Sequence, residues 1–378
     1  MTFRLAGSLA LAFGLSAAAA LAQPHPLETS VEKARAMLIK EDLGNGVYVF
    51  RAPSDLEYWT ATNSVVIVND DDVTVFDSCT RAVTAKAVIA EIRKLTDKPV
   101  RVLVNSHWHQ DHWSGNGEYA KAFPGLRIVA SAETRAYMTR MMSSFFATEL
   151  ADNGLTRKRE ELAAAIKTGK LADGSRLTPE VRALKEASIA MASQFEAEIQ
   201  ALPRVLPNLV FRDEMTFWSG RREMRLMSVT GDATGSTVLY LPESRILVTG
   251  DVLVSPEDGK GPPPWTTNSY AITPWLETLQ RLEALHAAAI VPGQGPAMHD
   301  GAYLRRTIEL FAAVLDQVHA ALERGLVRLS QIQAAVNVDA IGQAYAPGVP
   351  LNDEFRMVVA NLVKKSAQEA LDGVANLN

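Results

Sequence analysis

The stretch His107-Trp108-His109-Gln110-Asp111-His112 gives the first indication of the chemistry of this chain. Three of the chain's seven histidines fall within these six residues. The apolar run 100–104 directly before it has the length and the β-branched composition of a strand. Histidine and aspartate are ligands that zinc takes where thiolates are absent. The stretch therefore predicts a metal site in a loop at the end of a strand.

The spacing within this motif predicts how its side chains divide. In extended backbone, residues i and i+2 face the same side, so we expect His107 and His109 to hold one ion. After the chain turns, Asp111 and His112 can serve a second ion. Burying three imidazoles and a carboxylate together without an ion would be costly. A metal site is therefore favoured over a solvated polar loop.

Strand and helix signals around the motif indicate a layered α/β architecture. The predicted strands before the motif are residues 45–51, 64–68, 73–76 and 100–104. Residues 82–95 have helical spacing between the last two of these strands. Short strand signals return over 209–253 and at 290–293, with a helix predicted over 274–288. This order predicts sheets whose ends present loops.

Two regions of the chain are predicted to be purely helical. An insertion at about 132–203 contains helical stretches near 132–150, 156–168 and 178–202, the last with Thr178-Pro179 as its start signal. An apolar stripe along that last stretch is typical of ordinary helix association; a lid or a homodimer contact through the helical segments is the alternative. Residues 301–378 are predicted to be a helical C-terminal extension.

The first 22 residues have the pattern of a secretory signal peptide. Arg4 supplies a positive start, an Ala/Leu run follows, and Ala20-Leu21-Ala22 forms a cleavage pattern before Gln23. The run is shorter than the roughly 18 apolar residues that span a bilayer comfortably. We expect removal of residues 1–22 and a periplasmic or secreted protein without a stable membrane anchor; a retained anchor is the alternative.

Composition narrows the choice of partners. The chain has 378 residues and a net charge of -5, which offers no basic footprint for nucleic acid. We therefore expect a small-molecule substrate. Cys79 is the single cysteine, which excludes an intramolecular disulfide and a cysteine-rich zinc site, and we expect it to be buried.

The motif resembles the signature of the metallo-β-lactamase superfamily. Other features follow in the family's order: Asp77 after an apolar strand, Asp251 after the strand signal 248–250, and Gln294 in the turn 291–296. The resemblance implies a four-layer αββα sandwich over residues 23–300, interrupted by the helical insertion. It also implies a metal site at one edge of the two sheets.

This resemblance assigns roles to individual residues. It implies metal ligands at His107, His109, Asp111, His112, Asp232, Asp251 and Gln294. Asp111 would orient the attacking water, Asp251 would bridge two ions, and Asp77 would hold a ligating imidazole. The alternative for Asp77 is a cap at a strand end. The implied cofactor is zinc, as two ions, with manganese or iron as competitors because oxygen ligands favour harder metals.

Two positions depart from the family pattern. Asp232 and Gln294 stand where relatives carry histidine. The extra negative charge of Asp232 is expected to make a metal-bound water less acidic. The neutral Gln294 is expected to bind the second ion weakly; His299 could replace it, although a surface position is the simpler expectation for that histidine. A decayed, metal-free relative is the alternative interpretation.

The resemblance implies a hydrolase in which metal-bound hydroxide attacks an ester, thioester, lactone or amide-like substrate. β-Lactamase activity is not favoured, because such relatives carry Cys or Ser at the position of Asp251, and one class adds Lys at the position of Val254. Aromatic residues are expected to flank the substrate pocket, core positions being the alternative. These residues are Tyr58, Trp59, Trp108, Trp113 and Trp265.

Two other function classes remain open from the sequence. A mononuclear iron oxidoreductase of the persulfide-dioxygenase type could use His107, Asp232 and Asp251 as its ligands. A catalytically silent metal-binding protein could use the helical insertion as an interface. Metal content and turnover would separate both from a hydrolase.

Overall fold

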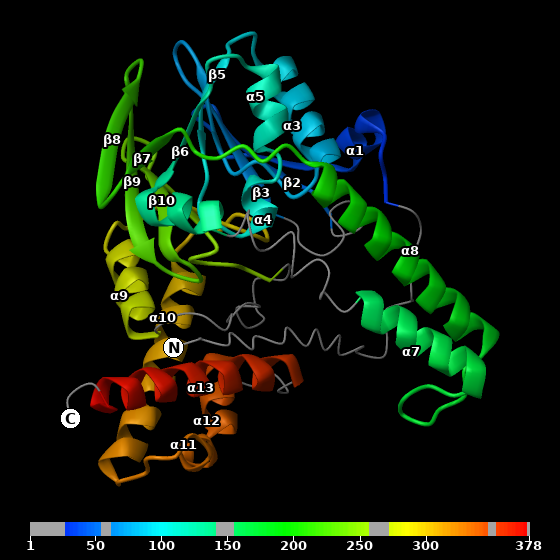
Figure 1. Ribbon diagram of the computed structural model, residues 1–378. Helices are drawn as coiled ribbons and strands as arrows, with labels where there is room; N and C mark the ends of the chain where they lie inside the picture. Colours follow the sequence, from blue (N-terminus) through cyan, green and yellow to red (C-terminus); the bar gives the residue numbers. More distant parts are fainter. Residues whose placement is uncertain (1–26, 54–61, 141–154, 257–271, 347–352, 376–378) are drawn as a thin grey trace.

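Two β-sheets face each other in the computed structural model, which describes residues 27–53, 62–140, 155–256, 272–346 and 353–375. The predicted signal peptide lies outside the described residues. The strand order of the first sheet is β1-β2-β3-β4-β5-β6-β7, and that of the second is β12-β11-β10-β9-β8 (Figure 1). The first sheet consists of β1 (Ile39–Asp42), β2 (Val47–Arg51), β3 (Asn63–Val68), β4 (Val73–Phe76), β5 (Val100–Val104), β6 (Arg127–Ser131) and β7 (Leu209–Phe211). The second consists of β8 (Glu214–Ser219), β9 (Arg222–Thr230), β10 (Thr234–Leu241), β11 (Ile246–Gly250) and β12 (Ala289–Pro292).

Strand β3 shows how alternation builds the sandwich. Val65 and Ile67 point into the apolar layer between the two sheets, whereas Val66 contributes to the layer beneath the outer helices. Successive side chains of a strand face opposite sides of its sheet, so a run that is apolar at every position is buried on both faces. This strand is therefore central rather than at an edge.

Helices cover the outer face of each sheet. The first sheet carries α3 (Ala82–Leu95) and α5 (Asn116–Ala122), with α1 (Val31–Met37) beside α3. The second sheet carries α9 (Ile272–Glu283), packed through its buried apolar face, and α10 (Ala302–Glu323) beside α9. The resulting helix–sheet–sheet–helix order is the αββα sandwich expected from the sequence.

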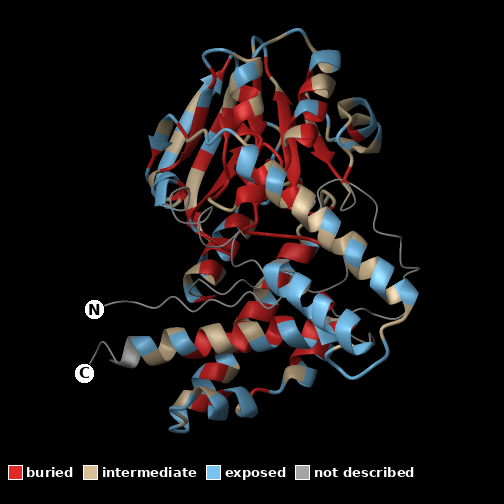
Figure 2. Cartoon of the chain, turned by 45° about the vertical axis from the view of Figure 1, so that its right-hand side comes forward, coloured by how far each residue is buried: buried red, intermediate tan, exposed pale blue. Residues whose placement is uncertain are grey.

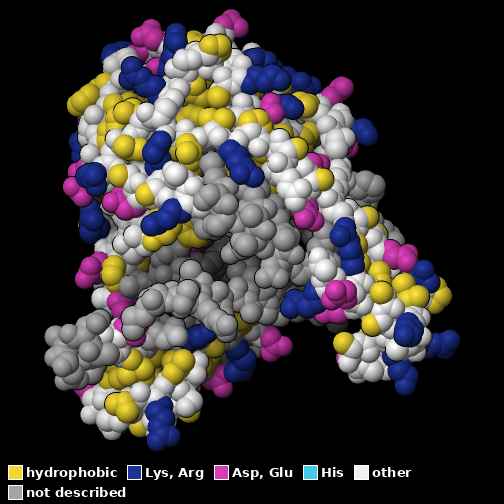
Figure 3. Space-filling model, viewed as in Figure 1, with side chains coloured by type: hydrophobic (Ala, Val, Ile, Leu, Met, Phe, Trp, Pro, Cys, Tyr) yellow, Lys and Arg dark blue, Asp and Glu magenta, His cyan; other side chains and the backbone are white. Residues whose placement is uncertain are grey.

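The insertion forms a helical hairpin that leaves the body of the sandwich. Its helices are α7 (Leu155–Thr168) and α8 (Pro179–Ala201), and the Thr178 side chain caps α8 by accepting the Val181 amide, as the start signal predicted. Residues 132–140 are also helical, and the remainder of that predicted stretch, 141–150, falls in the undescribed segment 141–154. Figure 2 shows that the hairpin is mostly exposed or half-buried, in contrast to the sheets. On the face seen in Figure 3 it carries acidic and basic side chains side by side.

The C-terminal region is helical, as expected. Helices α11 (Leu329–Ala335), α12 (Val338–Tyr345) and α13 (Asp353–Ala375) pack with α10 around one apolar cluster that continues to α9. The helix predicted over 274–288 is wrong at its end, because α9 stops at Glu283. The amide of Ala288 already donates to the Arg245 carbonyl at 2.7 Å, which aligns the chain with β11 for strand β12. Among the described residues, none of the helices has the length and apolar character to cross a membrane.

Candidate metal centre

The candidate side chains meet at one edge of the sandwich because each follows the end of a strand. Asp77 follows β4, and the histidine motif follows β5, in the first sheet. Asp251 follows β11, Gln294 follows β12, and Asp232 lies in the turn between β9 and β10, all in the second sheet. Both sheets therefore supply residues to the same site.

The motif changes from extended to helical conformation halfway along its length. His109 has extended angles (φ -67°, ψ 138°) and caps the short helix α4 (Gln110–Trp113), which carries Asp111 and His112. The side chains before and after this change consequently face different places. This is the division that the residue spacing predicted.

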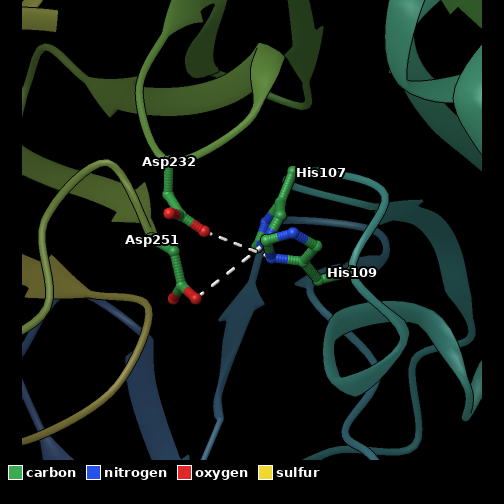
Figure 4. A group of neighbouring side chains, drawn as sticks. All are labelled: His107, His109, Asp232 and Asp251. Carbon is green, nitrogen blue, oxygen red and sulfur yellow. Dashed lines mark hydrogen bonds and ion pairs between the residues drawn. The ribbon is translucent and has the colours of Figure 1, made fainter. Parts of the chain in front are cut away.

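The first cluster of donor atoms joins His107, His109, Asp232 and Asp251, whose ligand atoms all lie within 4.8 Å of one another. His107 Nε2 lies 2.9 Å from His109 Nδ1, and His109 Nδ1 lies 3.2 Å from an oxygen of Asp232. His107 Nε2 lies 3.9 Å from an oxygen of Asp251 (Figure 4). The four side chains converge on one point.

The second cluster joins Asp111, His112 and Asp251. His112 Nε2 lies 3.2 Å from Asp111 Oδ2 and 3.3 Å from Asp251 Oδ2. The amide nitrogen of Gln294 lies 3.3 Å and 3.2 Å from the same two oxygens. Asp251 therefore belongs to both clusters, and Gln294 lies at the second.

The donor atoms fit a divalent metal in kind, spacing and lack of other partners. Ligands bound tetrahedrally at about 2.0–2.1 Å are separated from one another by about 3.3 Å. Three of the four nitrogen–carboxylate separations, at 3.2, 3.2 and 3.3 Å, match this value. His112 Nε2 and Asp251 Oδ1 are also buried without a hydrogen-bond partner, a costly arrangement unless an ion binds them.

Asp77 and Ser106 hold the imidazoles from behind. Asp77 Oδ2 lies 2.7 Å from His112 Nδ1, while its Oδ1 accepts the Ser106 amide at 2.7 Å. A proton on Nδ1 leaves Nε2 of His112 as the free donor atom. Ser106 Oγ lies 2.9 Å from His107 Nδ1 and plays the same part there. Asp77 thus combines the two functions considered from the sequence, an imidazole partner and a cap at a strand end.

Two polar residues that the sequence did not single out contact the site: Thr62, which precedes β3, and Asn63, which begins it. Thr62 Oγ1 donates to Asp111 Oδ2 at 3.0 Å. The Asn63 side chain donates to the carbonyls of Pro292 and Gly295 on either side of Gln294, at 2.8 Å each. The pair therefore fixes Asp111 and the Gln294 turn relative to each other. Its only sequence signal is a polar pair at the start of an otherwise apolar strand.

The turn that carries Gln294 requires glycine because Asp251 lies so close. A Cβ added at Gly293 would lie 2.0 Å from Asp251 Oδ1. The amide of Ser255 donates to the Gln294 carbonyl at 3.1 Å, which joins the loops that follow β11 and β12. Any side chain at Gly293 would displace the shared carboxylate.

Comparison with known proteins assigns the family. The model of the metallo-beta-lactamase superfamily matches residues 58–294, more than half of the chain. The chain belongs to the metallo-beta-lactamase superfamily. The chain is also similar to a curated protein, a linear primary-alkylsulfatase of Pseudomonas sp. (strain ATCC 19151), with 27% identity over 248 residues, which cover 64% of this chain. The match spans only 44% of that relative's length.

Solved structures also match the chain. A metallo-beta-lactamase from Pontibacter korlensis matches with 17% identity and a TM-score of 0.47, covering 72% of this chain and 97% of its own. The DIM-1 metallo-beta-lactamase matches with 14% identity and a TM-score of 0.44, covering 72% and 95%.

The electric charges of this superfamily site act most strongly on its second cluster. Burial alone would lower the pKa of His112, but the carboxylates of Asp251, Asp111 and Asp77 raise it well above its ordinary value. Burial would raise the pKa of the Asp111 carboxyl, yet the charge and hydrogen bond of His112 lower it. In the metal-free protein the pair is therefore an imidazolium beside a carboxylate.

The pKa values of the other three side chains, His107, His109 and Asp251, shift in different directions. Burial lowers the pKa of His107 well below its ordinary value, with the nearby His112 and His109 adding to the effect. Burial also opposes protonation of His109, but the hydrogen bond and charge of Asp232 raise its pKa. Burial raises the pKa of Asp251, and the charge of His112 offsets this only in part. His107 is consequently ready to bind a metal without losing a proton first.

The aromatic residues expected around the pocket divide into three groups. Trp108 is half-buried beside the His109 ring, at 4.3 Å between ring centroids, and stacks on Tyr137 at 5.6 Å. Trp113 takes the core position considered as the alternative: it is buried against Met138, and its Nε1 donates to the Trp108 carbonyl. Three further predicted pocket residues lie outside the described part of the chain, namely Tyr58, Trp59 and Trp265.

Two single residues can also be placed. His299 is exposed, as its surface interpretation predicted. Cys79 is buried and forms no disulfide, as expected for the single cysteine.

Proposed function

We propose that the protein is a metal-dependent hydrolase that acts on esters. The observation that carries the proposal is the pair of donor clusters that share Asp251 and have the spacing of metal ligands. We propose His107, His109 and Asp232 as ligands of the first cluster, and Asp111 and His112 as ligands of the second. Gln294 is proposed as a weak ligand of the second cluster, through its amide oxygen after rotation of the amide group.

The substrate class that we propose to test first is the sulfate ester of a linear alcohol. The support is the curated relative, whose name describes a linear primary-alkylsulfatase. Because the match covers less than half of that relative, carboxylic esters, thioesters and lactones belong to the same test. β-Lactams are not favoured, since an aspartate, Asp251, occupies the position at which β-lactamases of the family carry Cys or Ser.

The chain's own residues would orient the reactants. A bound divalent ion, zinc in the first instance, supplies a Lewis acid for the scissile group and lowers the pKa of water. Asp111 is ionised through its lowered pKa and can accept a hydrogen bond from the attacking water. Thr62 holds the Asp111 carboxylate by one oxygen, and Asp77 fixes the orientation of His112.

Exposure indicates the side from which substrate approaches. The His109 side chain is 24% exposed, whereas those of Asp111 and Asp251 are 11% and 6% exposed. Trp108 lies beside His109 on the same side. We propose that the substrate enters over this imidazole and indole pair, with Trp108 contacting its apolar part.

The test combines metal analysis with a substrate panel. The ratio of zinc, manganese and iron to protein is measured first, followed by turnover of a series of alkyl sulfates and matched carboxylic esters. Asp251→Asn is expected to weaken metal binding at both clusters, which share this carboxylate, and to lose most turnover. His299→Ala is the matched control, because this histidine is exposed and no ligand role is proposed for it. Full activity in the Asp251→Asn variant would overturn the proposal.

A mononuclear iron oxidoreductase is the second candidate, and one observation favours it. The first cluster is complete by itself, with two histidines and two carboxylates, while the Gln294 amide nitrogen faces the carboxylates of the second. A single ion bound at the first cluster would leave that hydrogen bonding intact. One iron per chain, together with oxygen consumption and no ester hydrolysis, would select this alternative.

We also propose that the protein is exported to the periplasm after cleavage between Ala22 and Gln23. The support is the signal-peptide pattern of residues 1–22. Intact-mass measurement of protein from the periplasmic fraction tests this. Recovery of the full-length chain in the cytoplasm would contradict it.

A further inference from the structure

A buried arginine lies behind the metal centre and has no part in the proposed chemistry. Arg81 is 1% exposed and is among the largest fully buried side chains of the described residues. Its Nε and Nη2 donate to the two carboxylate oxygens of Glu198 at 2.7 and 2.8 Å. Nη2 also donates to the Glu28 carbonyl at 2.9 Å. Such a two-point pair is directional, so it fixes the guanidinium in one orientation.

Arg81 ends a short loop that directly supports the second donor cluster. In this Asp77 loop (residues 77–81), Asp77 contacts the His112 imidazole, and the Ser78 amide donates to the His112 carbonyl at 2.9 Å. Thr80 Oγ1 donates to the Asp111 carbonyl at 3.4 Å. The loop therefore holds both the imidazole and the backbone of the cluster.

The Asp77 loop has a strained backbone. Asp77 and Cys79 have φ values of 61° and 72°, in the left-handed region that costs residues other than glycine conformational energy. Two such residues within three positions persist only where their surroundings hold them in place. The Asp77 amide donates to the Val104 carbonyl at 2.8 Å, and the Cys79 carbonyl accepts the Gly115 amide at 3.1 Å. Arg81, which is also the N-cap of α3, adds an anchor at the far end of the loop.

The anchor is built from the helical insertion and the N-terminal segment. Glu198 lies on α8, and Gln194 one turn earlier bonds both to Glu198 Oε1, at 3.1 Å, and to the backbone of Leu27, at 3.0 and 3.1 Å. Leu27 is buried against Phe195 of the same helix. The end of α8 is thus tied at once to segment 27–30 and to Arg81.

We propose that Arg81 is a positioning residue that couples helix α8 to the metal centre through the Asp77 loop. The guanidinium holds the strained loop in the conformation in which Asp77 faces His112. The helical insertion then has a role in metal binding without contributing a ligand. The coupling to metal rests on the ligand roles proposed above, whereas the ordering of the loop does not.

The first test uses hydrogen exchange of the full mature chain without metal. Glu198→Gln keeps the side-chain size but removes the negative charge that Arg81 requires, and Glu198 is 29% exposed, so folding should survive. We expect faster exchange of the amides of Ser78 and Ser106, which the Asp77 loop protects. Glu186→Gln is the control, because it breaks an exposed ion pair with Arg182 on the same helix. Faster exchange confined to α8 and segment 27–30 would overturn the proposal.

The second test measures how the protein holds metal, independently of turnover. Release of cobalt(II) to a chelator and the visible spectrum of the cobalt protein report on the donor atoms. Removing a partner of a ligand typically weakens metal affinity about 10–100-fold. We expect the low end, roughly tenfold, for Glu198→Gln, because Glu198 acts on Asp77 only through Arg81 and the loop. Arg81→Lys, which keeps the charge but cannot form the two-point pair, should fall between wild type and Glu198→Gln. Unchanged release and spectrum in Glu198→Gln would overturn the coupling. A wild-type chain that binds no cobalt would overturn the proposed function instead, and the exchange result would still decide the role of Arg81 in the loop.

Discussion

Asp77→Asn should change the tautomer of His112, and with it the metal affinity, while lowering the stability of the fold only moderately. The Asp77 carboxylate accepts a hydrogen bond from His112 Nδ1 across 2.7 Å, which keeps the imidazole proton on Nδ1 and leaves Nε2 free for a metal. An asparagine amide can instead donate to Nδ1, which moves the imidazole proton to Nε2 and blocks coordination. Asparagine also tolerates the left-handed backbone at this position, φ 61°, better than most residues.

The expected magnitudes follow from the two bonds of Asp77. Replacing a charge-assisted bond, worth about 1.5–3 kcal/mol, by a neutral one should lower the free energy of unfolding by about 1–2 kcal/mol. The bond from the Ser106 amide survives on Oδ1. Metal affinity of the second cluster should nevertheless fall about 10–100-fold. Asp77→Ala should cost more stability, about 2–6 kcal/mol, because two buried donors lose their acceptor.

Thermal or urea denaturation gives the stability change, and competition with a chromophoric chelator gives the metal affinity. Asp77→Asn should be closer to wild type than to Asp77→Ala in stability, but should match Asp77→Ala in metal binding. An Asp77→Asn protein with the affinity of wild type would refute the tautomer argument. Equal losses of stability in the two variants would refute the assignment of the Ser106 bond.

Four further outcomes are expected. Asp232→His should keep the first ion but shift its preference from manganese towards zinc, because imidazole is softer than carboxylate; a competition titration in which the preference stays unchanged would exclude Asp232 as a ligand. Gln294→His should raise the ratio at low, buffered free zinc from about one towards two ions per chain by completing a tetrahedral second cluster. Native mass spectrometry measures this ratio directly. Thr62→Val should lower turnover several-fold and the free energy of unfolding by about 1 kcal/mol, because Asp111 loses a hydrogen bond. Thr62→Ser keeps the hydroxyl and should retain both turnover and stability. Equal turnover in the two variants would argue against a positioning role for Thr62. The pKa of His112 is raised well above its ordinary value, so the imidazole is protonated at pH 7 in the metal-free protein. Metal binding at the second cluster should therefore release about one proton and weaken as pH falls. Calorimetry in buffers of different ionisation enthalpy would detect the released proton, and binding heats independent of the buffer would contradict it.

Local periodicity explains why much of the fold could be predicted from the sequence. Strands β4 and β5 and helix α3 have the predicted bounds, because burial on both faces of a strand and on one face of a helix leaves an unbroken pattern in the sequence. The geometry of the motif 107–112 could also be predicted from local sequence, because it arises from a change of backbone conformation within six residues.

Residues that act through distant partners left no such pattern. Thr62 meets Asp111 across 49 positions, and Arg81 meets Glu198 across 117. In the sequence, Thr62 and Arg81 are ordinary polar residues beside an apolar run. Trp113 was assigned to the pocket on proximity in sequence, but the helical turn of α4 directs it into the core. The end of α9 depended on a contact with Arg245, which the helical pattern could not reveal.

The division of the donor atoms between the two sheets has a consequence for when the metal binds. Gln294 and Asp111 are 183 residues apart in the sequence, and contacts of such separation form late because closing a long loop costs entropy before any contact repays it. An ion whose ligands come from both sheets can bind only after the sheets have packed together. It therefore cannot guide their association. It then acts as a cross-link, and each hundredfold excess of free ion over its dissociation constant adds about 2.7 kcal/mol against separation of the two halves. An ion that needs ligands from both sheets would therefore be selected by the folded chain without metal rather than by the nascent chain.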